Sequence, residues 1–237
     1  MKRIVLIALL LAAPMLAQTP PNERITKLVV LQNVDPQAIQ QLVRMFGVEV
    51  STANGQMKSM VISGAPEKVA AAEAAIKQLD VASKNIDLTV YFVVGGDQAT
   101  LEGGAVPQDL RDVITQLKGT FTFKEYKMLD VLTLRTRAGS GADTSGILNT
   151  GNPPKMSRFS IRNATVSDDG TTIRIDRMHA GLKIPLVSPG GKGVEYTDSG
   201  IDQDVDVKEG QKVVVGRASL EGPQKALFLI LTAHVIQ

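Results

Sequence analysis

The chain contains two histidines, His179 and His234, and no cysteine. Zinc sites need several His or Cys ligands at short spacings, and neither histidine has a second ligand at such a spacing. The absence of cysteine also excludes disulfides and thiolate metal sites. His234 lies in an apolar run, and His179 follows Met178 at the end of a predicted strand. We interpret both as hydrogen-bonded strand residues and predict no metal site around them.

Three aspartates, Asp202, Asp204 and Asp206, are spaced by two residues. In a strand this spacing places all three side chains on one face. A Ca²⁺ loop of the EF-hand type would also need its glycine and a distal glutamate, and both are missing. We therefore predict a solvated strand face. Convergence of Asp202 and Asp204 with His179 in one pocket would instead indicate a catalytic or ligand-binding site.

A glycine-rich stretch, Pro189–Gly193, and an acidic pair, Asp168–Asp169, are the next groups that could do chemistry. A phosphate-binding loop carries a Gly-Lys-Ser/Thr sequence and leads into a helix, and the stretch has neither feature. A flexible connection between strands fits it better. The acidic pair is followed by Gly170, and aspartate favours turns because its carboxylate bonds to nearby backbone groups. We predict a turn there.

Ser140, Ser145 and Ser199 lie in glycine-rich stretches, without the strand–elbow–helix setting of a serine hydrolase. Arg135 and Arg137 alternate with threonine, which is typical of an exposed sheet face. Side chains that act together should form constellations, and none is visible. We therefore predict no catalytic, cofactor-binding or metal-binding residues, no cofactor and no enzymatic activity.

The N-terminus has the form of a secretory signal peptide. Lys2 and Arg3 precede an uncharged apolar run, residues 4–15, and Ala17 is followed by a polar segment. The run is shorter than the ~20 residues that span a bilayer as a helix. We predict a signal peptide at residues 1–17 with cleavage after Ala17; an uncleaved N-terminal anchor is the alternative.

The charges of the exported chain balance. Removing residues 1–17 leaves 24 basic residues against 24 acidic ones. A balanced charge argues against an electrostatic nucleic-acid surface. The chain has no tryptophan and few aromatic residues on which bases could stack. We expect no nucleic-acid partner, and no further segment is long and apolar enough to cross a membrane as a helix.

Residues 24–81 divide into strand, helix, strand, strand and helix. Asp35–Pro36 caps and opens the first helix. Gly47 ends this helix, Asn54–Gly55 suits the turn between the second and third strands, and Pro66–Glu67 opens the second helix. Two helical stripes should be buried. They are Ile39, Leu42, Val43 and Phe46 in the first helix, and Val69, Ala72, Ile76 and Leu79 in the second.

This order, with Val61–Gly64 leading into Pro66–Val69 and ending in Ile76–Asp80, resembles the short periplasmic N-domains of secretins. Secretins are the outer-membrane pore proteins of type II and type III secretion and of type IV pili. The resemblance covers residues 25–80. It implies a compact βαββα fold that packs against neighbouring copies in rings, and it implies no catalysis.

The second half of the chain, residues 86–237, reads as a β-rich α+β domain with one helix. Alternation over residues 86–94 predicts a strand, and residues 107–118 have helical spacing. Residues 121–137 should form one long or two short strands. The stretch 138–157 is rich in Gly, Ser, Asn and Pro, and we predict either a flexible loop within the domain or a linker between two domains.

From residue 158 onward the pattern is all β. Leu182–Leu186 should be an edge strand because Pro185 lacks a donor for a central ladder. Residues 187–200 are predicted as a glycine-rich loop. Glu209–Gly216 followed by Leu227–Thr232 resembles a fragment of the secretin core. The chain is too short to carry the whole of that core, so we do not expect it to form a pore by itself.

Two functional hypotheses follow. The first is a non-enzymatic exported protein of the periplasm or outer membrane, which interacts with a secretin, with other envelope components of a secretion or pilus system, or with a second copy of itself. The strand edges of its first module would be the docking surfaces. The alternative is an exported small-ligand binder or hydrolase of the cell envelope, with a pocket formed by residues 158–237.

Overall fold

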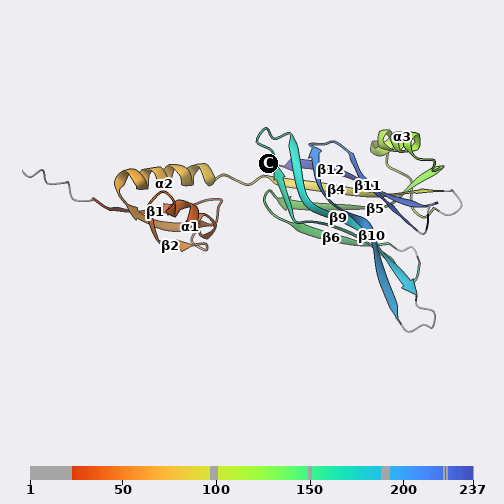
Figure 1. Ribbon diagram of the computed structural model, residues 1–237, viewed down its shortest axis with the longest axis horizontal. Coiled ribbons are helices and arrows are strands. Elements are labelled where there is room, and N and C mark those ends of the chain that lie inside the picture. The colour runs from red at the N-terminus through yellow and green to blue at the C-terminus, as the bar shows by residue number, and fades with distance from the viewer. Residues whose placement is uncertain are drawn as a thin grey trace, which may run out of the picture. The chain divides into compact units, whose positions relative to one another are not determined.

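A computed structural model describes residues 23–96, 101–148, 151–187, 193–220, 222 and 224–236. The predicted signal peptide and most of Pro189–Gly193 lie outside the described residues. The chain divides into two compact units, Met1–Ala82 (unit 1) and Ser83–Gln237 (unit 2), shown in Figure 1. The α+β class predicted from the sequence is confirmed.

Unit 1 has the predicted element order βαββα. Its elements are β1 (Ile25–Val30), α1 (Pro36–Arg44), β2 (Glu49–Asn54), β3 (Ser59–Gly64) and α2 (Pro66–Leu79). The strands form an antiparallel sheet in the order β1-β3-β2. At the start of α1, the Asp35 carboxylate accepts a hydrogen bond from the backbone N–H of Gln37 at 2.9 Å, and Pro36 follows the cap as predicted. Both helices cover one face of the sheet, and their inner stripes enclose the core of the unit.

One part of the predicted core of unit 1 is wrong. Ile39 and Val43 of α1 are buried, but Leu42 and Phe46 remain 43% and 39% exposed. Leu79, at the end of α2, is also exposed. The physical reason is the size of the sheet: three strands can cover only a narrow stripe of each helix, so the flanking apolar residues face outward.

Unit 2 is built from two antiparallel sheets and one helical segment. Its elements are β4 (Asn85–Gly96), η2 (Gln108–Leu110), α3 (Arg111–Thr120), β5 (Glu125–Arg137), β6 (Ala142–Leu148), β7 (Lys155–Ile161), β8 (Asn163–Val166), β9 (Thr172–Val187), β10 (Val194–Lys208), β11 (Val213–Ser219) and β12 (Ala226–Ile236). One sheet has the order β11-β12-β4-β5. The other has the order β10-β9-β7-β6, with β8 paired to β9.

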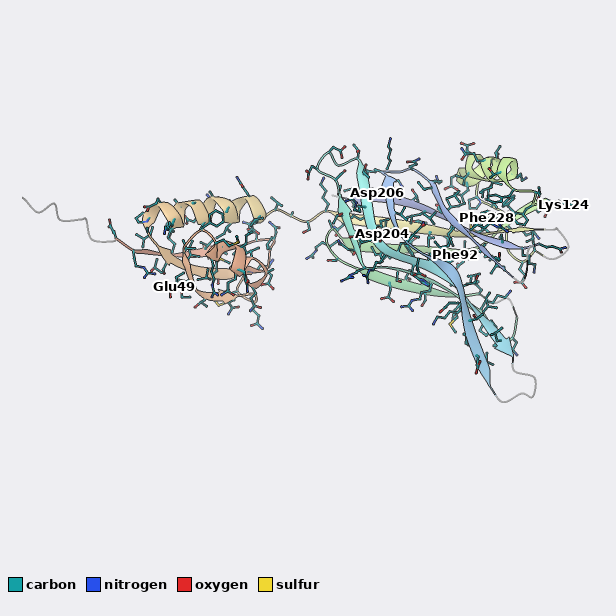
Figure 2. All side chains as sticks on the ribbon, in the orientation of Figure 1. Glu49, Phe92, Lys124, Asp204, Asp206 and Phe228 are labelled. Atoms are coloured by element: carbon teal, nitrogen blue, oxygen red, sulfur yellow. The ribbon has the colours of Figure 1, made fainter. Side chains whose placement is uncertain are left out.

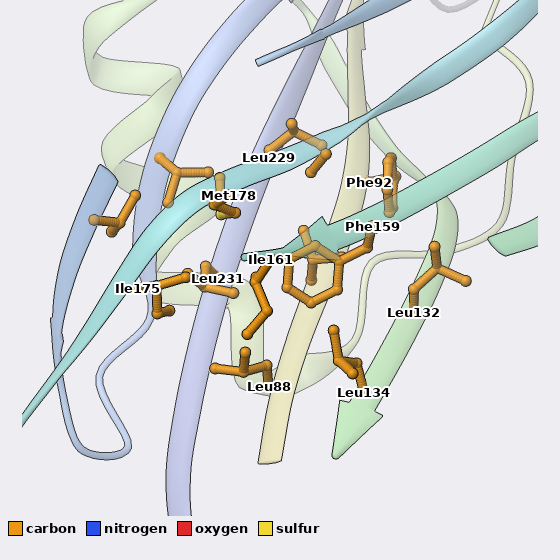
Figure 3. Packing of buried hydrophobic residues seen from close by; sticks show 14 of the residues in the cluster. Leu88, Phe92, Leu132, Leu134, Phe159, Ile161, Ile175, Met178, Leu229 and Leu231 are labelled. Atoms are coloured by element: carbon orange, nitrogen blue, oxygen red, sulfur yellow. The ribbon is translucent and has the colours of Figure 1, made fainter. Parts of the chain in front are cut away.

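The main core of unit 2 lies between its two sheets (Figure 3). Phe92 of β4 and Leu229 of β12 come from one sheet, and Phe159 of β7 and Ile175 of β9 come from the other; all four are fully buried. A second buried cluster lies on the opposite face of the β11-β12-β4-β5 sheet. It is covered by α3 and includes Phe228 of β12. Strands β4, β5 and β12 therefore have buried side chains on both faces of the sheet, which explains the continuous apolar sequence of β12.

Three predictions in unit 2 are wrong. The stretch 138–157 contains β6 and the beginning of β7, and these strands pair from Ala142 with Ile161 to Leu148 with Lys155. The predicted loop 187–200 contains the first half of β10. These strands were not predicted because they lack the apolar alternation that marks a strand in the sequence. The backbone hydrogen bonds of a β-ladder need no apolar side chains, and glycine or serine can occupy ladder positions at a modest cost in stability.

The third correction concerns β9, which is a central strand rather than an edge strand. It pairs with β10 on one side and with β7 and β8 on the other. Pro185 is nevertheless compatible with this position. Pairing with β7 ends at Lys183, so at Pro185 only β10 lies alongside. The expectation about proline thus holds locally, while the strand as a whole is central.

Candidate functional site: two exposed apolar surfaces

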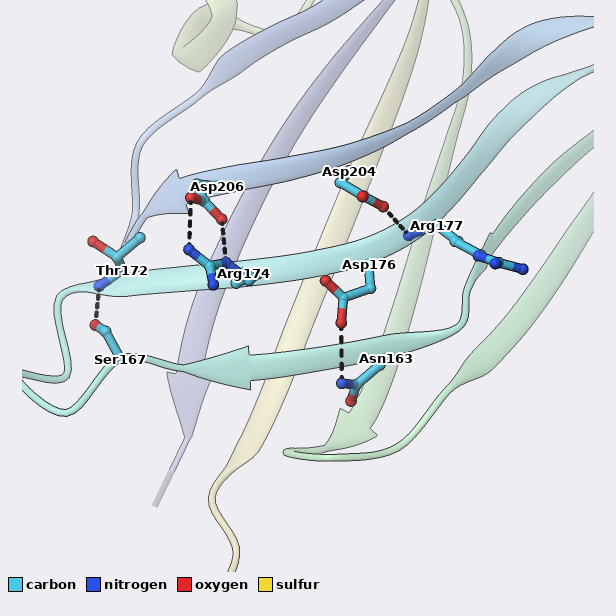
Figure 4. A network of polar contacts seen from close by, with 8 residues as sticks. All are labelled: Asn163, Ser167, Thr172, Arg174, Asp176, Arg177, Asp204 and Asp206. Atoms are coloured by element: carbon cyan, nitrogen blue, oxygen red, sulfur yellow. Dashed lines mark hydrogen bonds and ion pairs between the residues drawn. The ribbon is translucent and has the colours of Figure 1, made fainter.

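The acidic and histidine residues do not assemble into one site. His179 and Asp202 lie opposite each other on β9 and β10, with 2.8 Å between the histidine Nδ1 and the aspartate Oδ1. Asp204 instead accepts a hydrogen bond from the backbone N–H of Arg177 at 2.7 Å. Asp206 pairs with Arg174 through two contacts of 3.1 and 3.4 Å (Figure 4). The hypothesised convergence of Asp202, Asp204 and His179 is therefore absent.

Arg177 marks a bulge in β9. The pairing with β10 shifts between Gln203 and Val205, and Arg177 has a φ of 47°. Such a conformation is unfavourable for a side chain with a Cβ. The Asp204 carboxylate holds the N–H of this residue, so its visible role is to stabilise the bulge. On the other side of β9, the partner strand changes from β7 to β8 at the same level.

The remaining polar groups have local structural roles. Among the residues that the structure describes, no cluster of three His, Asp or Glu side chains could hold a metal ion. Asp169 lies in the predicted turn, where the hydroxyl of Ser167 and the amide and hydroxyl of Thr171 donate to its carboxylate. These bonds lower the pKa of Asp169 to about 2. Ser199 donates to the carbonyl of Ser219 at 3.2 Å and so ties β10 to β11.

Ser140 and Ser145 are exposed, and neither has a nucleophile–base pairing among the described contacts. Arg135 binds Asp87 through two bonds of 2.6 and 2.8 Å. The hydrogen bond from Arg135 lowers the pKa of the Asp87 carboxyl group. His234 lies opposite Asp87 on β12. This part of the sheet is an exposed face that carries an ion pair, as the alternation of Arg135 with threonine predicted.

Two further contacts of polar side chains in unit 2 were not visible in the sequence. Ser157 of β7 is fully buried and donates a short hydrogen bond to the Asp130 carboxylate of β5, which joins the two sheets. Gly146 of β6 lies beside this pair, where a Cβ would come within 2.7 Å of the Ser157 hydroxyl. In the α3 cluster, the Arg217 guanidinium lies 5.6 and 5.5 Å from the ring centres of Phe121 and Phe123. These contacts hold unit 2 together.

Unit 1 exposes an apolar surface on the free face of its sheet. Ile25 and Val29 of β1 pack against the core, so the alternate residues point away from the helices. Leu28 and Val30 are 66% and 65% exposed. Val61 of β3 lies directly opposite Leu28 and is half-buried. We call Leu28, Val30 and Val61 the sheet surface.

The rim of the sheet surface is polar. Thr26 and Ser63 lie opposite each other and share a hydrogen bond of 2.9 Å between their hydroxyls. Glu49, labelled in Figure 2, follows on β2 opposite Ser63. Its carboxylate pairs with Arg24 at 2.8 Å. An apolar centre with a polar rim is the composition of a protein-docking surface.

A second apolar surface lies at the end of α1. Leu42 and Phe46 are partly exposed, and Met45 between them is 82% exposed. The three residues are close in sequence, at the last turn of the helix and in the turn that follows it. We call Leu42, Met45 and Phe46 the helix surface. Methionine adapts its shape to irregular partners and is over-represented at binding surfaces.

No protein-family model matches the sequence, and no curated protein is significantly similar to it. Solved structures are similar in fold. The type III secretion injectisome secretin InvG of Salmonella matches with a TM-score of 0.57 and 14% identity, over 90% of this chain and 87% of InvG. This chain has a secretin-like fold.

Secretins of two other systems give the same result. GspD of the type II secretion system of Escherichia coli K12 matches with a TM-score of 0.60 and 13% identity, over 90% of this chain and 63% of GspD. PilQ, the type IV competence pilus secretin of Vibrio cholerae, matches with a TM-score of 0.57 and 11% identity, over 90% and 77% of the two chains. The secretin-like fold thus extends well beyond residues 25–80, to which the N-domain resemblance was assigned. Among the described residues, no helix has the length and apolarity to cross a membrane.

Proposed function

We propose that this chain is a non-enzymatic assembly module of the cell envelope, periplasmic or associated with the outer membrane, that works in a protein-secretion or pilus system. The observation that carries the proposal is the pair of exposed apolar surfaces on unit 1, within a chain of secretin-like fold. Solvent-exposed Leu28 and Met45 contribute little to folding, whereas an apolar patch with a polar rim favours protein contact.

The two surfaces differ, and this difference favours head-to-tail association. The sheet surface is formed by two strands and the helix surface by the end of α1. A contact between the two therefore joins different surfaces of the two copies. A contact between unlike surfaces leaves one free surface at each end of a dimer. Such contacts continue into rings or filaments rather than stopping at two copies. The partner is a second copy of this chain or a like unit in a secretin.

Other envelope proteins are further partners under this proposal. A solved structure is a complex of the secretin GspD with the pilotin AspS, so a protein of similar fold is found bound to a different protein. The alternative of an exported hydrolase or ligand binder required Asp202, Asp204 and His179 to converge. Asp202 contacts His179, but Asp204 binds the backbone N–H of Arg177 instead, so the three side chains do not converge and we do not propose an enzymatic activity.

The experiment uses two charged variants of the mature chain that begins at Gln18. L28K places a cation on the sheet surface, and M45K places one on the helix surface. We expect each variant to be monomeric by light scattering at concentrations where the wild type self-associates, because burying an unpaired charge is costly. Q78K, which adds the same charge to an exposed position of α2, should associate like the wild type.

Mixing the two variants tests the head-to-tail arrangement. Each variant keeps one intact surface, so an equal mixture of L28K and M45K should form a 1:1 dimer that neither forms alone. Self-association of one variant would show that its intact surface pairs with itself. If the wild type remains a monomer and crosslinking in the envelope of intact cells captures no partner, the proposal is wrong.

A further inference from the structure

Asp80, the residue that follows the last helix of unit 1, binds a loop that is distant in sequence. Its carboxylate accepts hydrogen bonds from three successive backbone N–H groups, those of Gln32 and Asn33 at 2.7 Å and that of Val34 at 3.1 Å. The Asn33 side-chain amide donates to the backbone carbonyl of Asp80 at 2.9 Å. Four hydrogen bonds thus join Asp80 to residues 32–34, which lie 46 to 48 positions earlier in the chain.

The position of this contact connects three parts of the chain. Residues 32–34 form the loop between β1, which carries the sheet surface, and α1, which carries the helix surface. Asp80 caps the end of α2, where its own N–H donates to the carbonyl of Ile76 at 2.8 Å. The chain then leaves toward unit 2, whose first strand begins at Asn85. We call the end of α2, where the chain leaves unit 1, the exit of unit 1. The Asp80 carboxylate therefore fixes this exit to the loop between the two apolar surfaces.

We propose that Asp80 is a charge-dependent clasp, a positioning residue that holds the exit of unit 1 against the β1–α1 loop. Only an ionised carboxylate can accept all three N–H groups with its two oxygens at full strength. The clasp itself is independent of the proposed function. Its consequence, that the two surfaces keep a fixed relation to the chain leading into unit 2, rests on that function.

The electrostatic surroundings favour the ionised form. The backbone hydrogen bonds from Gln32 and Asn33 lower the pKa of Asp80 below its ordinary value of 3.8. Lys58, in the turn between β2 and β3, adds an attractive charge, and its ammonium group donates to the carbonyl of Gln32 at 2.6 Å. Lys77 lies in the last turn of α2, and the loop residues 32–34 are uncharged.

The sign of the pH dependence follows from this shift. A carboxyl group whose pKa is lower in the folded state stabilises that state above its unfolded pKa, and the contribution is lost as pH falls through the folded value. The clasp is therefore closed at neutral pH and opens in acid, with a midpoint below the ordinary aspartate pKa of 3.8. Acid titration serves as a reversible way to open it in the unaltered protein.

The test follows individual amide signals of the ¹⁵N-labelled mature chain by NMR. On acidification, the amide proton shifts of Gln32, Asn33 and Val34 should move together, with one midpoint below the ordinary aspartate value. In D80A their hydrogen exchange should accelerate at least about tenfold, since they lose bonds to a charged group. D80N keeps one acceptor oxygen and should give an intermediate rate.

A matched control lies on the same helix. E73Q removes a carboxylate that pairs with Lys27 at 2.8 Å and should leave the three amides unchanged. If D80A fails to fold, D80N and the acid titration still decide the question. Three amides that titrate separately, or that exchange equally in D80N and the wild type, would overturn the proposal. Because these readouts are local, they are separable from any failure of self-association.

Discussion

The two units distribute their apolar side chains differently. Unit 1 encloses a small core beneath a three-stranded sheet and leaves Leu28, Val30 and Met45 largely in solvent. Unit 2 encloses its core between two sheets and covers a second cluster with α3. Its outer face along β9 and β10 carries charges in cross-strand pairs, such as Arg174 with Asp206. Unit 1 is thus completed by a partner in our proposal, while both clusters of unit 2 are covered by its own elements and Ile147 and Leu186 are exposed on its strands β6 and β9.

The two units also differ in whether the backbone groups of their edge strands are hydrogen-bonded. In unit 2, Gln203 of β10 donates to the carbonyl of Val215 on the edge strand β11 at 2.6 Å, so side chains of one sheet satisfy the edge of the other. In unit 1, β1 is an edge strand and is paired on one side only, with β3. An exposed apolar edge is a site where another chain can dock.

The largest expected effect comes from truncating a side chain at the centre of the unit 2 core, which tests whether this core stabilises unit 2 alone. Phe92 is fully buried between the sheets. We expect F92A to destabilise unit 2 by about 3–5 kcal/mol. All three tyrosines, Tyr91, Tyr126 and Tyr196, belong to unit 2, so tyrosine fluorescence during urea unfolding reports that unit.

The same experiment tests whether the units are independent. Amide signals of unit 1, recorded by NMR at each urea concentration, should keep the wild-type midpoint in F92A. The reciprocal variant I62A removes a buried side chain of unit 1 and should leave the tyrosine transition unchanged. If either variant shifts both transitions together, the units fold as one body and the comparison fails.

A smaller effect concerns close backbone contact in unit 2. Gly181 of β9 lies opposite Gly200 of β10, and a Cβ on Gly181 would come within 2.7 Å of the Gly200 Cα. Since the obstacle is backbone, we expect G181A to cost about 1–3 kcal/mol. The control is G119A in α3, where a Cβ meets nothing within 4 Å. It should stabilise by about 0.5–1 kcal/mol, as alanine does in helices.

Both glycine variants are measured by the tyrosine transition in urea. Equal midpoints for G181A and the wild type would mean that the two strands can separate without cost. In that case the β9–β10 pair would be less tightly packed than the rest of unit 2, and the contrast between the units would weaken.

Much of unit 1 could be predicted because its signals are local. The Asp35 side chain caps α1 and Pro36 opens it, while α2 has no side-chain cap and begins with Pro66 alone. The exposure of Leu42 and Phe46 could not be predicted, because periodicity identifies an apolar face but not the width of the sheet that covers it. The helix surface therefore contains residues that periodicity had assigned to the core.

In unit 2 the strands with alternating apolar residues were predictable, and β6 was not. Its ladder with β7 includes Gly146 opposite Ser157, a pair with no apolar pattern. The spacing of Asp202, Asp204 and Asp206 correctly indicated strand β10. Their partners depend on the register with β9, which shifts at the Arg177 bulge, and no local signal specifies that shift. The sequence pattern identified Asp80 as the end of the second helix of unit 1. It gave no indication that the Asp80 carboxylate binds the loop of residues 32–34.

The smallest expected effect lies in unit 1 and is the most informative for the comparison. L28K and M45K change exposed residues, so their cost to the folding of the monomer should be within about 0.5 kcal/mol. I39A, one turn away from the helix surface but buried, should cost about 2–5 kcal/mol. The measurement is the urea midpoint of unit 1 amide signals at a dilution where every variant is monomeric. A cost for L28K or M45K as large as that of I39A would show that these side chains support the fold itself, so their effect on association could no longer be assigned to a docking surface.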